Sequence, residues 1–250
     1  MLVAAAVCPC PPLLVPEVAA GAAPELDAVR AACADALGVL AAARPDLLLV
    51  VGPAERPGRG VFPQGSRGTF RGYGVGIDVH LGATLPGAGR PEGGRTGDGP
   101  GGERELPGSL AVGAWLLERA GWAGAPVEAL GVGEPLEAER CLTTGRELAG
   151  RAARVAMLVM GDASACRTLK APGYLDERAA PFDAEAARAL GAADLAAIRE
   201  LDADLAYRLR ASGRAPWQVL AGAAEDAGLV GALLYDDAPY GVGYLVATWS

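Results

Sequence analysis

The sequence predicts an α/β protein with a mostly parallel or mixed central sheet and helices on both faces of that sheet. Two observations carry this prediction. Several short runs of the chain are continuously apolar, which is typical of strands buried on both faces. These runs alternate with helical patterns over almost the whole chain, as in folds built from strand–helix repeats. We therefore assign residues 1–250 to a single domain, which is long enough to bury a full hydrophobic core.

Five apolar runs are the predicted buried strands. They are residues 2–8, 47–52, 155–161, 232–236 and 243–249. A sixth segment, residues 72–82, alternates apolar side chains with others, and its apolar residues are Val75, Ile77, Val79 and Leu81. Alternation with a period of two indicates a strand with one face in water, so we expect this strand at or near a sheet edge.

Helical patterns lie between these runs. Pro24 predicts the start of a helix over residues 24–43, and Ser109 predicts the N-cap of a helix over residues 109–121. Further helices are predicted over residues 137–153, 183–190, 193–209 and 216–228. Residues 86–105 are rich in glycine and hold no apolar cluster that would offset the entropy of ordering, so we expect a mobile loop there.

The composition argues against several classes of function. A net charge of −8 argues against a nucleic-acid-binding protein, which needs a basic face. No stretch approaches about 18 uninterrupted apolar residues, so we expect no membrane span. Five cysteines at irregular spacings give no disulfide framework, and they fit a reducing compartment. We expect a cytoplasmic protein, and a homo-oligomer stays open.

Two long segments without periodicity, residues 53–71 and 162–181, follow predicted strands. In open α/β sheets, ligands bind beyond the carboxyl ends of the strands. We therefore expect these two loops and the turn "CPCPP" at residues 8–12 to share one cleft.

Several segments, taken in order, resemble one known family. They are an apolar strand running into "PCPPLLVPE", a second strand ending "VVGPA", a third ending "VMGDASA", then "APGYLDERAAPFD" and the terminal "APYGVGYLVA". The series spans nearly the whole chain and resembles the class III extradiol ring-cleavage dioxygenases, that is, the LigB-like catalytic subunits and their Memo-like relatives. The resemblance implies the α/β fold of that family.

The resemblance also implies a non-haem Fe(II) held by two imidazoles and a carboxylate, with open positions for a catechol and dioxygen. In the family pattern, histidines stand in a "PHPPL" turn, an "SPH" turn and a "GDLSH" turn. The matching positions here are Cys10, Ala54 and Ala165. His80 is the single histidine of the chain, so one chain cannot assemble a site with two imidazoles. No carboxylate ligand can be placed near "SGRAPW" either, and we predict a degenerate metal site without an iron cofactor.

Cys10 and Asp162 are the candidate catalytic residues. Residues two apart in an extended segment point the same way, so the thiols of Cys8 and Cys10 are both candidates to face the cleft. A Cys-x-Cys pair alone is weak evidence for a metal site. The alternative for Cys8 is a small apolar residue at the end of a strand.

Residues 161–170, "GDASACRTLK", carry the densest group of polar side chains at any predicted strand end. Arg167 and Lys170 suit an anionic ligand, because guanidinium and ammonium groups pair with carboxylates and phosphates. Ser164 and Tyr240 complete the predicted ligand-binding residues. The alternative is that Asp162 and Ser164 cap the following turn.

Three functions stay open. The first is a pseudoenzyme or binding protein whose cleft takes a small anionic or aromatic ligand, or a peptide of a partner. The second is an enzyme of altered chemistry that uses Cys10 with Asp162, or a metal bound through thiolate. The third is a residual Fe(II) extradiol dioxygenase that acts on a catechol-type substrate.

Overall fold

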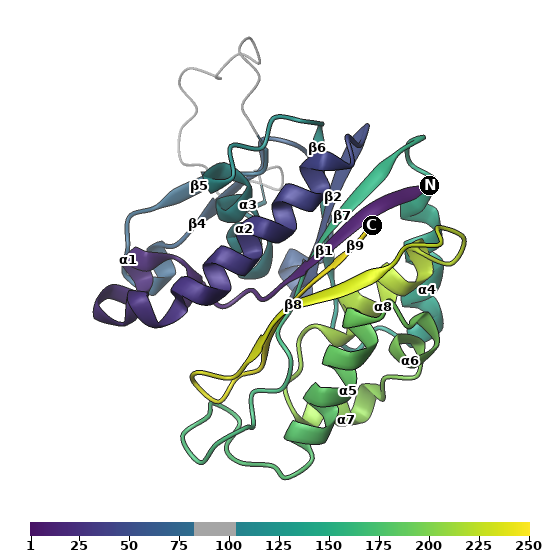
Figure 1. Ribbon diagram of the computed structural model, residues 1–250. Helices are drawn as coiled ribbons and strands as arrows, with labels where there is room; N and C mark the ends of the chain where they lie inside the picture. Colours follow the sequence, from purple (N-terminus) through teal and green to yellow (C-terminus); the bar gives the residue numbers. More distant parts are fainter. Residues whose placement is uncertain (83–103) are drawn as a thin grey trace.

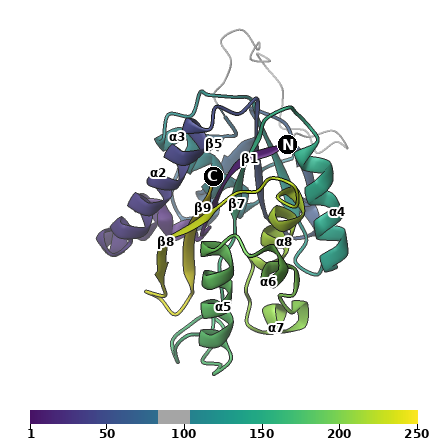
Figure 2. The same ribbon diagram turned by 45° about the vertical axis from the view of Figure 1, so that its right-hand side comes forward.

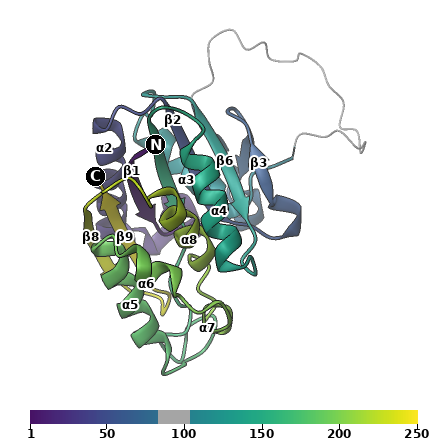
Figure 3. The same ribbon diagram turned by 90° about the vertical axis from the view of Figure 1, so that its right-hand side faces the viewer.

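The computed structural model describes residues 1–82 and 104–250, and in this part of the chain a mixed seven-stranded sheet lies between two layers of helices (Figure 1). In order across the sheet, the strands are β3 (Gly60–Phe62), β6 (Val127–Val132), β2 (Leu47–Pro53), β7 (Val155–Met160), β1 (Leu2–Cys8), β9 (Tyr244–Trp249) and β8 (Gly231–Asp237). The four central strands from β6 to β1 are parallel, whereas β3, β9 and β8 are antiparallel to their neighbours. Figure 3 shows β3 and β6 toward one edge of the sheet and β8 at the other. The predicted α/β fold with a mixed sheet is confirmed.

The two faces of the sheet carry different helices (Figure 2). One layer holds α2 (Asp27–Ala42) and α3 (Gly108–Arg119). The other layer holds α4 (Ala138–Ala149), α5 (Ala179–Gly191), α6 (Leu195–Arg199), α7 (Ala203–Arg208) and α8 (Arg214–Ala223). Successive side chains of a strand reach the two layers in turn, so that Ala5 and Val7 of β1 pack on the α4–α8 side and Ala4 and Ala6 on the α2–α3 side.

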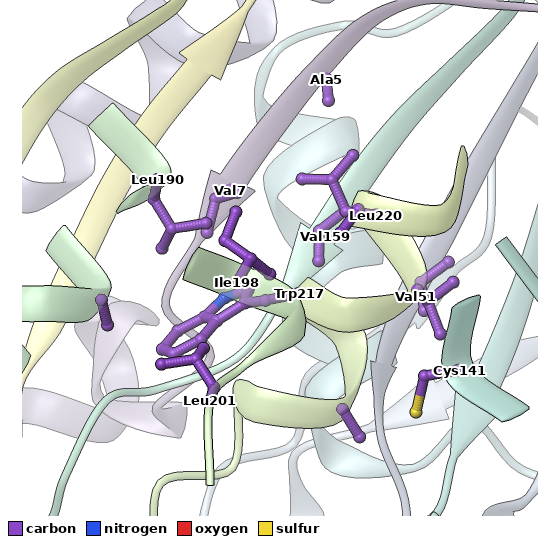
Figure 4. Packing of buried hydrophobic residues seen from close by; sticks show 14 of the residues in the cluster. Ala5, Val7, Val51, Cys141, Val159, Leu190, Ile198, Leu201, Trp217 and Leu220 are labelled. Carbon is purple, nitrogen blue, oxygen red and sulfur yellow. The ribbon is translucent and has the colours of Figure 1, made fainter. Parts of the chain in front are cut away.

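Figure 4 shows the core on the α4–α8 side, where Trp217 of α8 lies beside Ile198 of α6 and Leu201. Trp217 and Ile198 are fully buried. Burial of a side chain as large as that of tryptophan stabilises the fold strongly. This packing fixes the first turn of α8 against the sheet, immediately after the segment that forms one wall of the pocket described below.

A second sheet of two strands, β4 (Arg67–Thr69) and β5 (Asp78–His80), packs against α3. The remaining elements are short: η1 (Pro12–Leu14), α1 (Pro16–Ala19), η2 (Ala20–Leu26), η3 (Arg56–Gly58) and η4 (Arg71–Tyr73). Pro24 therefore lies in a 3₁₀ turn, and the predicted helix begins later, at Asp27.

Five predicted strands are confirmed, as β1, β2, β7, β8 and β9, within one residue at each end. The prediction that residues 232–236 form a buried strand is wrong in one respect, because β8 is an edge strand with mostly exposed residues. The predicted strand over residues 72–82 is reduced to β5, because Gly74 turns the chain with a φ of 86°. Its apolar side chains still face the core: Val79 is buried, and Val75 packs against the α2–α3 side. Strands β3, β4 and β6 were not predicted.

The predicted helix over residues 193–209 is divided into α6 and α7. Asp194 and Asp202 each act as an N-cap, with their carboxylates accepting hydrogen bonds from backbone N–H groups three residues later. Ser109 is not the N-cap of α3. It is buried inside the first turn, and its hydroxyl donates a hydrogen bond to the carbonyl of Pro53 at 2.6 Å.

The predicted mobile loop over residues 86–105 lies outside the described residues as far as residue 103. Arg104 belongs to the described part and is anchored. Its guanidinium donates to the carbonyls of Arg59 and Val61, at 2.8 Å each, and lies 4.1 Å from the centre of the Phe62 ring. Among the helices of residues 1–82 and 104–250, none has both the length and the apolar character that crossing a bilayer requires.

Candidate functional site

A pocket of about 720 Å³ opens where the carboxyl ends of β2 and β6 meet the connection between α7 and α8. Its charged and polar lining residues are Glu55, Arg59, Glu134, Tyr207, Arg208, Arg210 and Ser212. The pocket lies at the edge of the sheet where ligands bind in α/β proteins. The predicted cleft is only partly right: the loop after β2 lines this pocket, but neither residues 8–12 nor residues 162–181 do, because the segment before α8 takes their place.

Cys10, Asp162 and Ser212 meet directly behind the wall of this pocket. The backbone N–H of Cys10 donates to Oδ1 of Asp162 at 2.8 Å, and the backbone N–H of Asp162 donates to the hydroxyl of Ser212 at 3.1 Å. The hydroxyl of Ser212 also forms a hydrogen bond with the thiol of Cys10. Because Ser212 lines the pocket, this cluster joins the turn after β1 and the loop after β7 to the pocket wall.

Two glycines allow this close approach. Gly161 follows β7 and Gly213 precedes α8, and a Cβ on Gly161 would lie 2.4 Å from the Cα of Gly213. The N–H of Gly213 donates to the carbonyl of Asp162 at 2.8 Å. A side chain at position 161 would displace residues 210–213 from the end of β7, and Ser212 would move with them.

Burial determines the protonation of both catalytic candidates. It raises the pKa of the Asp162 carboxyl to about 6, against the opposing effect of the hydrogen bond from Cys10. Burial, and then the negative charge of Asp162, hold the pKa of the Cys10 thiol well above its ordinary value. Thiolate is the nucleophilic form of cysteine. The structure therefore brings the two candidates together but leaves Cys10 as a neutral thiol.

Cys8 does not face the pocket. Its side chain is fully buried on the α2–α3 side of the core, where it forms a hydrogen bond with Cys33 of α2 that raises the pKa of the Cys8 thiol well above its ordinary value. The interpretation of Cys8 as a small apolar residue at a strand end agrees with this position.

Ser164 and Arg167 belong to a buried network instead of the pocket. Asp183 of α5, which is 1% exposed, accepts hydrogen bonds from the backbone N–H and the hydroxyl of Ser164, at 2.8 Å each. The guanidinium of Arg167 completes the network at 3.0 Å from Asp183. Both predicted ligand-binding residues are therefore occupied in fixing the loop after β7 against α5.

The other predicted residues also lie outside the pocket lining. Lys170 is exposed on the loop after β7. The hydroxyl of Tyr240 donates to Oε2 of Glu25 at 3.0 Å, which links the β8–β9 turn to η2. His80 lies in β5, and its backbone N–H donates to Glu118 of α3.

The residues present do not fit the iron centre that the family resemblance implies. Of the three positions matched to histidines, Ala54 lines the pocket, and Cys10 and Ala165 are each 8% exposed. In the described ranges, 1–82 and 104–250, no three His, Cys, Asp or Glu side chains are grouped to hold a metal ion. Residues 207–214, which reach the site, contain arginines and no carboxylate.

Sequence reasoning missed the arginines of the pocket. The guanidinium of Arg59 lies over the backbone of Gly133, since a Cβ there would come within 2.4 Å of its Nε atom. Arg210 donates to the carbonyl of Pro172 at 2.9 Å. Arg208, at the end of α7, forms no hydrogen bond or ion pair with any residue that the structure describes. The signal in the sequence is the run "RLRASGR" at residues 208–214, directly after the divided helix.

Arg214, 1% exposed, holds the turn after β6 in place. Its guanidinium donates to the backbone carbonyls of Glu134 and Leu136 and to Oε1 of Gln218. The side chain of Glu134 forms no hydrogen bond or ion pair with the described residues, and one of its oxygens is buried. Burial raises the pKa of this carboxyl, against the opposing charge of Arg214.

Comparison with models of known protein families gives no match, and comparison with curated proteins gives none either. The fold is similar to that of a solved structure, the uncharacterized protein JW3007 from Escherichia coli K12, with a TM-score of 0.55 and 13% sequence identity. The similarity covers 99% of this chain and 100% of that chain. At this identity the likeness bears on the fold alone, and it agrees with an α/β architecture over the whole chain.

Proposed function

We propose that this chain is a divergent, non-catalytic relative of the extradiol dioxygenases that binds a small organic anion in the pocket beside Ser212. The observation that carries the proposal is the set of three arginines, Arg59, Arg208 and Arg210, in the lining of one pocket at the carboxyl ends of the strands. A guanidinium group pairs with carboxylates and phosphates through two parallel hydrogen bonds. Arg208 is available for such a pair, because its guanidinium forms no hydrogen bond or ion pair with any residue that the structure describes.

The charge of the lining supports an anionic ligand. The chain as a whole carries a net charge of −8, yet three arginines and two glutamates line this pocket. A volume of about 720 Å³ suits an organic molecule better than a simple ion. Tyr207 adds an exposed aromatic ring to the lining, which suits a ligand with an apolar or aromatic part.

The protonation and identity of the other residues favour binding over catalysis. Ala54 and Ala165 have no donor atom in their side chains, so they cannot replace the imidazoles of an iron site. Burial raises the pKa of the Cys10 thiol, which argues against the alternative of an enzyme with Cys10 as its nucleophile. Asp162 is held by Cys10 and supports the turn.

Calorimetric titration with L-malate tests the proposal. We expect saturable binding by the wild-type chain, weakened about tenfold, or about 1.4 kcal/mol, by Arg208→Gln and by Arg210→Gln. Arg188→Gln is the matched control, because Arg188 of α5 pairs with Glu185 and Asp194 outside the pocket. The proposal fails if L-malate, succinate and L-aspartate all give no saturable heat, or if the control variant weakens binding as much as Arg208→Gln does.

A further inference from the structure

We propose that the anion bound in this pocket also carries a hydrogen-bond donor, a hydroxyl or an ammonium group, and that Glu134 accepts it. The inference rests on the proposed anion pocket and specifies its ligand further. The ligand class is then a carboxylate or phosphate compound with a donor group beside its charge. Arginine side chains bind the anionic end, and the Glu134 carboxylate binds the donor.

The first observation is that Glu134 lines the pocket without a partner. The residue is half-buried, and its Oε1 atom is buried without a hydrogen-bond partner among residues 1–82 and 104–250; no ion pair joins the carboxylate to these residues. Nearly all polar groups inside folded proteins are paired with protein or with water, and an unpaired one costs free energy. A ligand that donates a hydrogen bond to this unpaired carboxylate therefore gains binding free energy.

The second observation is that no arginine of the described residues forms an ion pair with the Glu134 carboxylate, although the charge of Arg214 acts on it. Arg214 binds the backbone carbonyl of Glu134 and not its carboxylate, and this contact fixes the turn. Arg59 passes over the neighbouring Gly133, yet no ion pair joins Arg59 to Glu134. The pocket therefore presents the Glu134 carboxylate and the guanidinium group of Arg208 at separate points of one lining, each without a hydrogen bond or ion pair to the described residues. A ligand with both a donor and an anionic group complements this arrangement, whereas a simple anion leaves the carboxylate unpaired.

Glu55 provides an internal comparison. It lines the same pocket and carries the same charge, but it is exposed and therefore solvated. Water satisfies an exposed carboxylate at little cost, so a ligand gains little by pairing with it. The preference for a donor is consequently expected to depend on Glu134 and not on Glu55.

Three probes that share one skeleton test the inference. Succinate, L-malate and L-aspartate are four-carbon dicarboxylates with hydrogen, hydroxyl and ammonium at the second carbon. At about pH 8, with Glu134 ionised, we expect L-malate and L-aspartate to bind the wild-type chain about fivefold or more tighter than succinate. Glu134→Ala is expected to reduce this preference to about twofold or less, and Glu55→Ala to retain it. The malate and aspartate arms show whether hydroxyl or ammonium is the preferred donor.

Each outcome bears on the inference. Equal affinity of the wild-type chain for the three probes overturns the donor site and leaves the anion pocket standing. Loss of the preference in Glu55→Ala, or its survival in Glu134→Ala, also overturns the inference. Absence of binding by every probe overturns the anion pocket itself. If Glu134→Ala does not fold, Glu134→Gln decides, because it removes the charge that pairs with ammonium and should abolish the advantage of L-aspartate.

Discussion

The backbone N–H of Cys10 donates a hydrogen bond to Oδ1 of Asp162 at 2.8 Å, and this contact joins the first turn of the chain to the end of β7. Pro9, Pro11 and Pro12 restrict the backbone of the same turn. Asp162 therefore receives its partner from the backbone of a stiff turn, and the carboxylate supports the shape of the site. At position 10 of this turn the chain has a thiol where the family resemblance implies an imidazole.

The ionised carboxylate of Asp162 destabilises the folded chain at neutral pH, and Asp162→Asn is expected to remove this effect. Asp162 has a pKa of about 6 in the folded chain, above its ordinary value of 3.8, so the folded state binds this proton more tightly than the unfolded state does. The stabilisation that results is present below about pH 4 and is lost as the pH rises through about 6, a change on the order of 2 kcal/mol. Asparagine keeps an acceptor for the N–H of Cys10 and does not titrate.

Urea denaturation of both proteins at about pH 4 and about pH 7.5 measures this effect. From about pH 4 to about pH 7.5, the free energy of unfolding of the wild-type chain should fall. This fall should exceed that of Asp162→Asn by about 2 kcal/mol. Parallel pH dependence of the two proteins would show that Asp162 is not buried in the folded chain.

The thiols of the first turn are expected to differ in reactivity. Cys10 is 8% exposed and Cys8 is 0% exposed, and the pKa of each thiol is raised above its ordinary value. Alkylation of the native protein should be slow at both positions and faster at Cys10. Peptide mass mapping over time gives the two rates, and urea should make them equal. Faster modification of Cys8 would contradict the burial of β1 described above.

Replacement of Cys10 separates a structural thiol from a catalytic one. Cys10→Ala should lower the free energy of unfolding by about 1 kcal/mol and leave binding of L-malate unchanged, because Cys10 lies behind Ser212 and not in the lining. Loss of malate binding with an unchanged melting temperature would place Cys10 at the ligand.

The strands were predictable because their signal is local. The run over residues 155–161 is apolar throughout, since side chains on both faces of β7 are buried beneath helices. The division between α6 and α7 was missed although its cause, the N-cap at Asp202, is also local, because the apolar pattern continues across it. The prediction of one strand over residues 72–82 failed for a different reason. The apolar side chains do face the core, but a turn at Gly74 replaces most of the strand.

The site residues were harder to predict because their roles depend on contacts between distant segments. Ser164 and Arg167 pointed to a ligand in the sequence, but they bind Asp183, which lies in a later helix. Ser212 reaches Asp162 only through the contact between Gly161 and Gly213, which no spacing in the sequence reveals. The resemblance to extradiol dioxygenases pointed to Cys10, which lies behind Ser212 and outside the pocket lining, and it gave no information on the arginines.

Arg214→Met is expected to destabilise the protein by about 3 kcal/mol. It removes the donors to the carbonyls of Glu134 and Leu136 and leaves those partly buried acceptors unpaired, beside an arginine side chain that is itself buried. Arg199→Met is the control, because Arg199 is exposed and its ion pair with Glu225 spans 3.6 Å, so about 1 kcal/mol or less is expected. Equal effects in urea denaturation would contradict the structural role of Arg214.

Metal analysis is expected to find no stoichiometric iron in protein purified from medium supplemented with iron. Ala54 and Ala165 offer no ligand atom, and the Cys10 thiol is neutral. Protocatechuate should give no ring-cleavage product and no oxygen uptake. One iron per chain, together with oxygen uptake on addition of a catechol, would contradict the degenerate metal site.

The measurement that tests the central claim most directly is the location of a bound anion by two-dimensional ¹H–¹⁵N NMR during titration with L-malate. We expect shifts of backbone signals concentrated in residues 54–59, 133–136 and 207–213, which surround the pocket, and we expect these shifts to be lost in Arg208→Gln. Two results would contradict an anion pocket beside Ser212. One is a set of shifts centred on another pocket, such as the one between α5 and α6 that includes Phe182 and Leu201. The other is a wild-type spectrum that L-malate leaves unchanged.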